Sequence, residues 1–174
     1  MKTPVMTWPL KVALDYASHG WAIVPLWWPR GGRCTCAEGS DCGSPGKHPL
    51  TEHGVNDASS SRDDILQWFK RWPHANIGIA TGALSGVVVL DVDPRNAGDE
   101  SLANLISDYG PLPPGPTVRT GGGGRHFYFT FREGMLLPKT AGDGLDLLAN
   151  GRLATAPYSE HVSGQRYAWE VRPW

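Results

Sequence analysis

Two aspartates at the end of an apolar segment are the residues of this chain best suited to chemistry. The segment 87–90 consists of Val-Val-Val-Leu and leads directly into Asp91 and Asp93. Side chains two positions apart share one face of a strand, so both carboxylates would project together, with Cβ atoms roughly 7 Å apart. Like charges on one face favour a cation between them, and carboxylate oxygens favour Mg²⁺ or Mn²⁺ with substrate phosphates. The pair predicts metal-assisted phosphoryl transfer, and a solvated Asp-Val-Asp-Pro turn is the alternative.

A glycine-rich segment followed by a histidine is the second candidate site. The glycines of segment 121–124 let a backbone approach an anion closely and present N–H groups to it. Arg119 and Arg125 flank these glycines with forked donors suited to phosphate. We interpret this segment, including Gly124, as a cradle for a triphosphate in which His126 donates to a phosphate oxygen. The alternative is a flexible glycine hairpin with a surface histidine.

The segment after the glycines has the alternation of a strand. Phe127, Phe129 and Phe131 fall on one face, and His126 and Tyr128 fall on the other. We expect the phenylalanine face to lie in a core. The histidine face is then expected to be open.

A third carboxylate lies within an apolar strand pattern further along the chain. Asp146 alternates with Leu145 and Leu147 and therefore faces away from them. A charge on a strand needs solvent or a partner. A metal shared with Asp91 and Asp93 is one solution, and a surface position on an edge strand is the other.

Three thiols and an imidazole lie within one short, glycine-rich loop. These are the residue types of a tetrahedral zinc site: Cys34, Cys36, Cys42 and His48. The loop has little apolar content, so a structural zinc ion would supply the energy that orders it. His53 is an alternative fourth ligand, Lys47 is a candidate contact to phosphate or template, and three reduced surface thiols are the alternative to a zinc site.

Composition limits the class of protein. With 174 residues, 40% of them apolar and 19% charged, the chain is expected to be one globular domain over residues 1–174, with the zinc-held loop at about 34–48 inserted. A net charge of −1 excludes a polycation that binds nucleic acid through bulk charge. No apolar run approaches the roughly 20 residues that span a bilayer, so no membrane contact is expected, and three clustered cysteines favour a reducing compartment such as the cytoplasm.

The hydrophobic pattern indicates which elements position these residues. Helical spacing is found at 9–19, 65–72 and 102–109. Strand patterns are found at 21–26, 76–80, 87–90, 117–120, 126–131, 145–148, 153–156 and 167–171. Helices and strands mix without strict β-α-β repetition, which predicts an α+β domain around a mostly antiparallel sheet.

The order and spacing of these motifs resemble the N-terminal domain of bifunctional primase–polymerases, in the archaeo-eukaryotic primase superfamily. The resemblance runs from about Ala13 to Trp169. It is carried by segments 44–49, 76–82, 85–93, 125–129, 144–146, 156–159 and 163–164.

The resemblance implies a sheet like that of RNA-recognition domains as the catalytic core. It also implies two divalent metals held by Asp91, Asp93 and Asp146, with His126 on the triphosphate of the incoming nucleotide. The family often has serine two residues before this histidine, where this chain has Gly124. Backbone N–H groups would then replace the hydroxyl contact.

Together these observations predict a template-directed nucleotidyltransferase that makes and extends primers on single-stranded DNA from NTPs or dNTPs. Lys139 and Arg152 flank the third aspartate and are expected to contact phosphate or the DNA backbone. The expected setting is plasmid- or phage-type DNA replication in a bacterial cytoplasm, with a helicase domain or partner downstream of an N-terminal fragment. Two alternatives remain: a non-catalytic zinc-bearing DNA-binding module of a replication initiator, and a metal-dependent nucleotide-sugar transferase.

Overall fold

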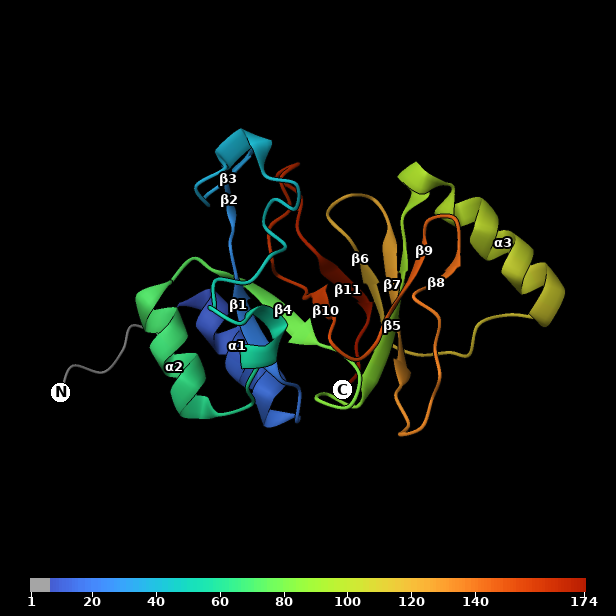
Figure 1. Ribbon diagram of the computed structural model, residues 1–174, viewed down its shortest axis with the longest axis horizontal. Coiled ribbons are helices and arrows are strands. Elements are labelled where there is room, and N and C mark those ends of the chain that lie inside the picture. The colour runs from blue at the N-terminus through green and yellow to red at the C-terminus, as the bar shows by residue number, and fades with distance from the viewer. Residues whose placement is uncertain (1–6) are drawn as a thin grey trace.

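The computed structural model describes residues 7–174, and this part of the chain has an α+β fold (Figure 1). The helices are α1 (Trp8–Ser18), α2 (Arg62–Arg71) and α3 (Gly98–Tyr109), with 3-10 turns η1 (Gly39–Asp41), η2 (Gly54–Asp57) and η3 (Pro94–Asn96). The strands are β1 (Ile23–Leu26), β2 (Pro29–Arg30), β3 (Arg33–Cys34), β4 (Asn76–Ala80), β5 (Val87–Val92), β6 (Thr117–Arg119), β7 (Arg125–Thr130), β8 (Thr140–Gly142), β9 (Leu145–Leu148), β10 (Leu153–Thr155) and β11 (Ala168–Val171). The predicted fold class is confirmed.

The larger sheet has six strands in the order β11-β6-β7-β5-β9-β8, and every neighbouring pair is antiparallel. Strand β5 lies between β7 and β9. Its apolar run of β-branched residues is typical of a strand covered on both faces. The register of its two neighbours decides which side chains lie beside Asp91, one residue before the strand ends.

A smaller antiparallel sheet, β1-β4-β10, packs with α1 and α2 against one face of the larger sheet (Figure 1). The main core joins side chains from both sheets and from α1, among them Ile77, Val89, Tyr128 and Tyr16. Helix α3 lies on the other face of the larger sheet, where Leu102 packs with residues of β5 and β9 in a second core. Strand β5 is therefore held rigidly between two cores.

The expectation of an open histidine face on β7 is wrong. His126 and Tyr128 are only 3% and 2% exposed, because the main core and the segment before β11 cover that face. Phe127 and Phe129 point the other way and are half-buried in the second core. Both faces of this strand are covered, which alternation along a single strand does not reveal.

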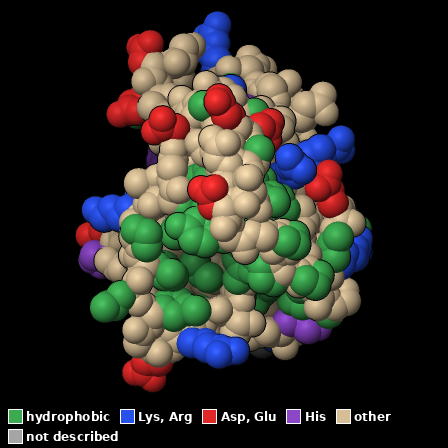
Figure 2. Space-filling view, turned by 90° about the vertical axis from the view of Figure 1, so that its right-hand side faces the viewer, with side chains coloured by type: hydrophobic (Ala, Val, Ile, Leu, Met, Phe, Trp, Pro, Cys, Tyr) green, Lys and Arg blue, Asp and Glu red, His purple; other side chains and the backbone are tan. Residues whose placement is uncertain are grey.

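The view from the α3 side shows hydrophobic side chains gathered in the middle of this face (Figure 2). Helix α3 has two large hydrophobic side chains that are exposed, Ile106 and Tyr109. None of the helices found in residues 7–174 has the length and apolar character needed to cross a membrane.

Candidate functional site

The register of the larger sheet aligns three of the predicted site residues. Asp91 on β5 lies directly opposite His126 on β7 and directly opposite Asp146 on β9. Directly paired residues of an antiparallel sheet project from the same face. The Nε2 atom of His126 lies 3.5 Å from Oδ1 of Asp91. Three strands that are far apart in the sequence thus place two carboxylates and one imidazole side by side on one face of the sheet.

Asp93 follows the end of β5 and caps η3. Its Oδ1 accepts from the backbone N–H and from Nε of Arg95, both at 3.0 Å. Its Oδ2 accepts from Nη2 of Arg95 at 2.9 Å and from the Asn96 amide at 3.0 Å. Hydrogen bonding and charge from Arg95 hold the pKa of Asp93 below its usual range. The carboxylate is therefore ionised and oriented, with both oxygens already engaged.

Two glycines hold the backbone of Asp93. Its N–H donates to the carbonyl of Gly144 at 2.8 Å, and its carbonyl accepts from the N–H of Gly98 at 3.0 Å. A Cβ atom on Gly98 would lie 2.7 Å from both the Asp93 and the Gly144 carbonyl oxygens, which no real side chain tolerates. Absence of side chains at these two positions is what allows β5, β9 and α3 to meet at the aspartate.

The glycine loop is a closed turn. The N–H groups of Gly123 and Gly124 both donate to Thr120, at 3.1 Å to its carbonyl and 2.9 Å to its hydroxyl. These two N–H groups therefore already have acceptors, so the loop offers fewer free N–H groups to an anion than predicted. A Cβ atom on Gly124 would run into the carbonyl oxygen of Val92. The loop as folded here therefore requires glycine at this position.

A small polar cavity of about 40 Å³ lies at the end of β5. Its lining residues are Lys47, Asp91, Val92, Asp93, Arg95, Thr120, Gly122, Gly124, His126 and Tyr167. Two cations, two carboxylates and a buried imidazole thus face one space. Lys47 comes from the loop that follows the cysteines, so the inserted segment contributes directly to this site.

His126 is held as a neutral ring. Burial lowers its pKa, and the charge of Asp91 offsets only part of this effect. Its Nδ1 atom is buried and has no hydrogen-bond partner within the described part of the chain. Buried polar atoms are nearly always paired, so a ring nitrogen left in this state beside a polar cavity is suited to a ligand.

Four predicted phosphate contacts do not line this cavity. Arg125 is exposed on the opposite face of β7 from His126, where its Nη2 donates to Asp99 of α3 at 3.3 Å. Arg119 is paired with Arg125 in register and shares that face. Lys139 and Arg152 flank the third aspartate in the chain but lie outside the cavity as well.

His161 was missed by sequence reasoning and supports the glycine loop from behind. It is 6% exposed, and its Nδ1 lies 2.9 Å from the hydroxyl of Ser163, which donates to the Gly121 carbonyl at 2.8 Å. Burial lowers the pKa of His161, and the positive charges of Lys47 and Arg95 add to the effect. Arg95 was also missed, because only the turn after β5 brings it back onto Asp93.

The cysteine loop forms a compact metal-ligand group. One ligand atom from each member lies within 4.8 Å of all the others, and the members are Cys34, Cys36, Cys42 and His48. The Nε2 atom of His48 lies 3.5 Å from the sulfur atoms of Cys34 and Cys42. Burial lowers the pKa of His48, which favours the neutral ring that binds zinc.

The alternative ligand His53 lies outside this group. Its Nδ1 atom is 3.0 Å from a carboxylate oxygen of Asp57 instead. In the part of the chain that the structure describes, the cysteine–histidine group is the one set of three or more such side chains gathered this closely. The three aspartates are therefore spread more widely than a closed structural zinc site.

One protein-family model matches nearly the whole chain. The model of the family described as bifunctional DNA primase/polymerase, N-terminal, matches residues 13–173. A comparison with curated proteins gave no match. The matched range includes the three aspartates, the glycine loop, His126 and the cysteine–histidine group. The chain belongs to the bifunctional DNA primase/polymerase N-terminal domain family.

Proposed function

We propose that the chain is a template-directed nucleotidyltransferase that synthesises primers and extends them on single-stranded DNA. Family membership supports a primase/polymerase type of nucleotidyltransferase in general. The specific proposal rests on one observation. Asp91 is paired in register with both Asp146 and His126, beside a cavity lined by Lys47 and Arg95. A cavity lined by both carboxylates and cations suits a bound nucleoside triphosphate with its metals.

Asp91, Asp93 and Asp146 would hold divalent metal ions, and their oxygen donors fit Mg²⁺ or Mn²⁺. When bound, two such ions lower the pKa of the attacking 3′-hydroxyl and neutralise the pyrophosphate that leaves. The 3′-oxygen forms a bond to the α-phosphorus as the bond to pyrophosphate breaks. Both oxygens of Asp93 are engaged by Arg95 and Asn96, so this role requires Asp93 to share or exchange these partners.

The remaining residues of the cavity position the triphosphate. Lys47 and Arg95 neutralise its charge, and Arg95 would donate to phosphate in place of Asp93. His126 donates a hydrogen bond from its neutral ring, which rigid packing on β7 holds in place. Preorganised donors of this kind lose little free energy in ordering when the substrate binds. We place this activity in plasmid- or phage-type replication in a bacterial cytoplasm, next to a helicase domain or partner.

A primer-synthesis assay tests the proposal. Purified protein is incubated with single-stranded DNA and labelled NTPs or dNTPs, with Mg²⁺ or Mn²⁺. Asp91→Asn and Asp146→Asn should each reduce product formation by about 100-fold or more, since each removes a negative charge from the metal donors. Asp99→Asn is the matched control, because this exposed carboxylate on α3 pairs with Arg125 outside the cavity.

Two results would contradict the proposal. One is a normal rate of synthesis by Asp91→Asn. The other is DNA binding by the wild-type protein without any nucleotide addition, which would favour the non-catalytic DNA-binding module. One observation favours this alternative: Arg95 and Asn96 already donate hydrogen bonds to both carboxylate oxygens of Asp93.

A further inference from the structure

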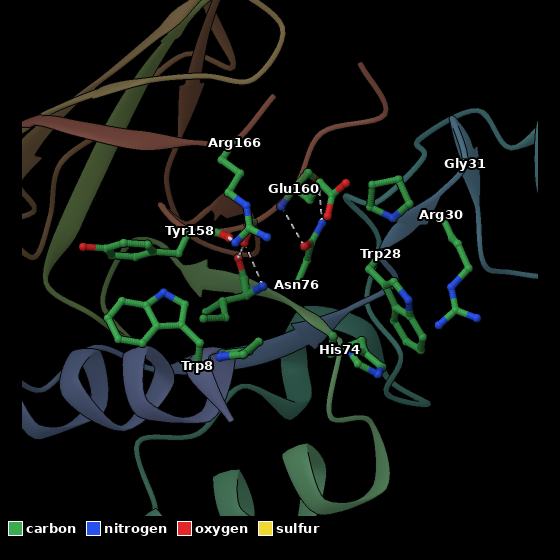
Figure 3. A pocket seen from close by; sticks show the side chains of 14 residues that line it. Trp8, Trp28, Arg30, Gly31, His74, Asn76, Tyr158, Glu160 and Arg166 are labelled. Carbon is green, nitrogen blue, oxygen red and sulfur yellow. Dashed lines mark hydrogen bonds between the residues drawn. The ribbon is translucent and has the colours of Figure 1, made fainter. Parts of the chain in front are cut away.

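A second and much larger cavity lies apart from the aspartates. Its volume is about 380 Å³, and it opens between the start of α1, strand β2, the segment before β4 and the segment 158–166 (Figure 3). Three aromatic side chains and two guanidinium groups line it: Trp8, Trp28, Tyr158, Arg30 and Arg166. Trp8 and Tyr158 lie at one end, and Trp28 and Arg30 lie at the other (Figure 3).

The aromatic side chain Trp8 is fixed by packing but keeps much of its ring surface exposed. Trp8 is 55% exposed although it packs edge-on against Tyr158, with ring centroids 5.6 Å apart at 82°. Such an exposed indole at a cavity rim presents a face on which a planar group can stack. At the other end, the Trp28 ring lines the cavity, and its Nε1 atom is buried away from it.

The backbone of Tyr158 is held in an uncommon conformation. Its φ is 73°, in the left-handed region that side chains other than glycine rarely adopt. The hydrogen bond from its N–H to the Tyr167 carbonyl, at 2.8 Å, fixes this conformation. Conformations of this kind concentrate at ligand sites, where the surrounding structure maintains them. Here the conformation holds the ring against Trp8.

The charges of the cavity favour an anion. Arg30 is exposed, and neither it nor Arg166 forms a salt bridge with any carboxylate in the described residues. Arg166 donates to the Tyr158 carbonyl at 3.3 Å, and its other donors remain available. Glu160 is the one acidic residue of the lining, and its carboxylate can accept from an exocyclic amino group of a base.

Asn76 and its hydrogen-bond partners lie between this cavity and the polar cavity that Asp91 and Asp93 line. Asn76 donates to the carbonyls of Gly46 and Glu160, at 2.9 and 2.8 Å. Gly46 is followed in the chain by Lys47, which lines the polar cavity, and Glu160 is followed by His161, which supports the glycine loop. A strand bound in the larger cavity would therefore pass close to the nucleotide site.

We propose that the larger cavity binds a nucleotide unit of single-stranded DNA outside the polymerisation site. A base stacks on Trp8, and the adjoining phosphates pair with Arg30 and Arg166. Stacking on aromatic side chains beside cationic groups is the usual means of binding single strands without sequence preference. The inference rests on the proposed function in one respect, which is that the bound strand is the template.

Equilibrium binding without metal ions or nucleotides tests this inference separately from catalysis. Fluorescence anisotropy of a labelled oligothymidylate is measured for the wild-type protein and for Trp8→Ala and Arg30→Gln. Trp8→Ala should raise the Kd about 10-fold, as expected for the loss of one stacked base. Arg30→Gln should give a smaller rise that disappears at high salt. Tyr109→Ala and Arg62→Gln are matched controls, because they remove an exposed aromatic ring and an exposed guanidinium group elsewhere.

Each outcome decides the inference. Thermal unfolding of the variants verifies that they are folded, which the exposure of Trp8 leads us to expect. Unchanged Kd values for Trp8→Ala and Arg30→Gln overturn the inference even if the protein makes primers. Displacement of the oligonucleotide by free thymidine monophosphate at equal nucleotide concentration also overturns it, since the cavity would then be a mononucleotide site. If binding depends on Trp8 but the protein makes no primers, this inference stands and the proposed function fails.

Discussion

At the scale of single residues, the geometry of Asp93 depends on a position that has no side chain. Gly144 has a φ of +67°, and a Cβ atom there would lie 2.5 Å from the Asn96 carbonyl oxygen and 2.7 Å from that of Asp93. Gly144→Ala should reduce the free energy of unfolding by about 2–4 kcal/mol, through backbone strain and a steric clash together. Urea denaturation measures this change.

Gly151 provides the matched control for this substitution. Its φ is +73°, and no atom lies within 4 Å of an added Cβ atom. Gly151→Ala therefore carries the conformational cost alone, about 1 kcal/mol. Equal destabilisation by the two substitutions would mean that the close approach at Gly144 does not hold Asp93. The same comparison in the primer assay should show a loss of activity for Gly144→Ala only.

At the scale of elements, we expect the hairpin β2–β3 and the loop after it to depend on metal binding by the cysteine–histidine group. These strands have only two residues each, and most of the loop between Cys34 and His48 lacks regular structure. We expect one zinc ion per chain, because metal binding supplies the ordering energy that such a segment lacks. Removal of zinc by a chelator should lower the Tm and open this loop to proteases.

Metal analysis of two histidine variants checks the assignment of the fourth ligand. His48→Ala should reduce the zinc content, whereas His53→Ala should leave it unchanged, because His53 pairs with Asp57. Wild-type protein prepared with added zinc but containing none would contradict the site. Loss of zinc from His53→Ala and not from His48→Ala would contradict the choice of ligand.

Local pattern predicted those elements whose signals lie within their own sequence. The apolar stripe around Leu102 indicated α3, and the β-branched run from Val87 indicated β5. Strands β2, β3 and β8 were missed, because these short segments lack an apolar strand pattern of their own and are recognised only through their pairing.

The candidate site was predicted only in part, because the pattern of one strand does not show which side chains the rest of the fold brings to it. Asp91 and Asp146 could be singled out as charges in strand patterns, and the register of the sheet places them opposite each other. The burial of His126 could not be read from its own strand, since side chains from elsewhere in the fold cover it. Arg95 returns to Asp93 through a turn of the chain, which periodicity does not encode.

At the scale of the whole molecule, the charge distribution limits how the protein can hold DNA. The chain has 16 Lys and Arg against 17 Asp and Glu, so its net charge of −1 gives no overall attraction for a polyanion. Binding must then come from a few local cations. Arg30 and Arg166 line the larger cavity, and Lys47 and Arg95 line the polar one. The proposed roles assign Lys47 and Arg95 to the triphosphate, so Arg30 and Arg166 are the phosphate contacts that the two cavities leave for DNA.

This number predicts a weak dependence of DNA binding on salt. Each phosphate contact to a single strand contributes a slope of about −0.7 to the plot of log K against log salt concentration. Two contacts therefore give a slope of about −1.4, or a loss of affinity of about 7-fold between 50 and 200 mM salt. Anisotropy titrations over this range measure the slope, and Arg30→Gln should make it less negative by about 0.7. A slope of about −3 or steeper would require additional cations, and Arg119, Lys139 and Arg152, which lie outside both cavities, would then be the next candidates for the DNA path.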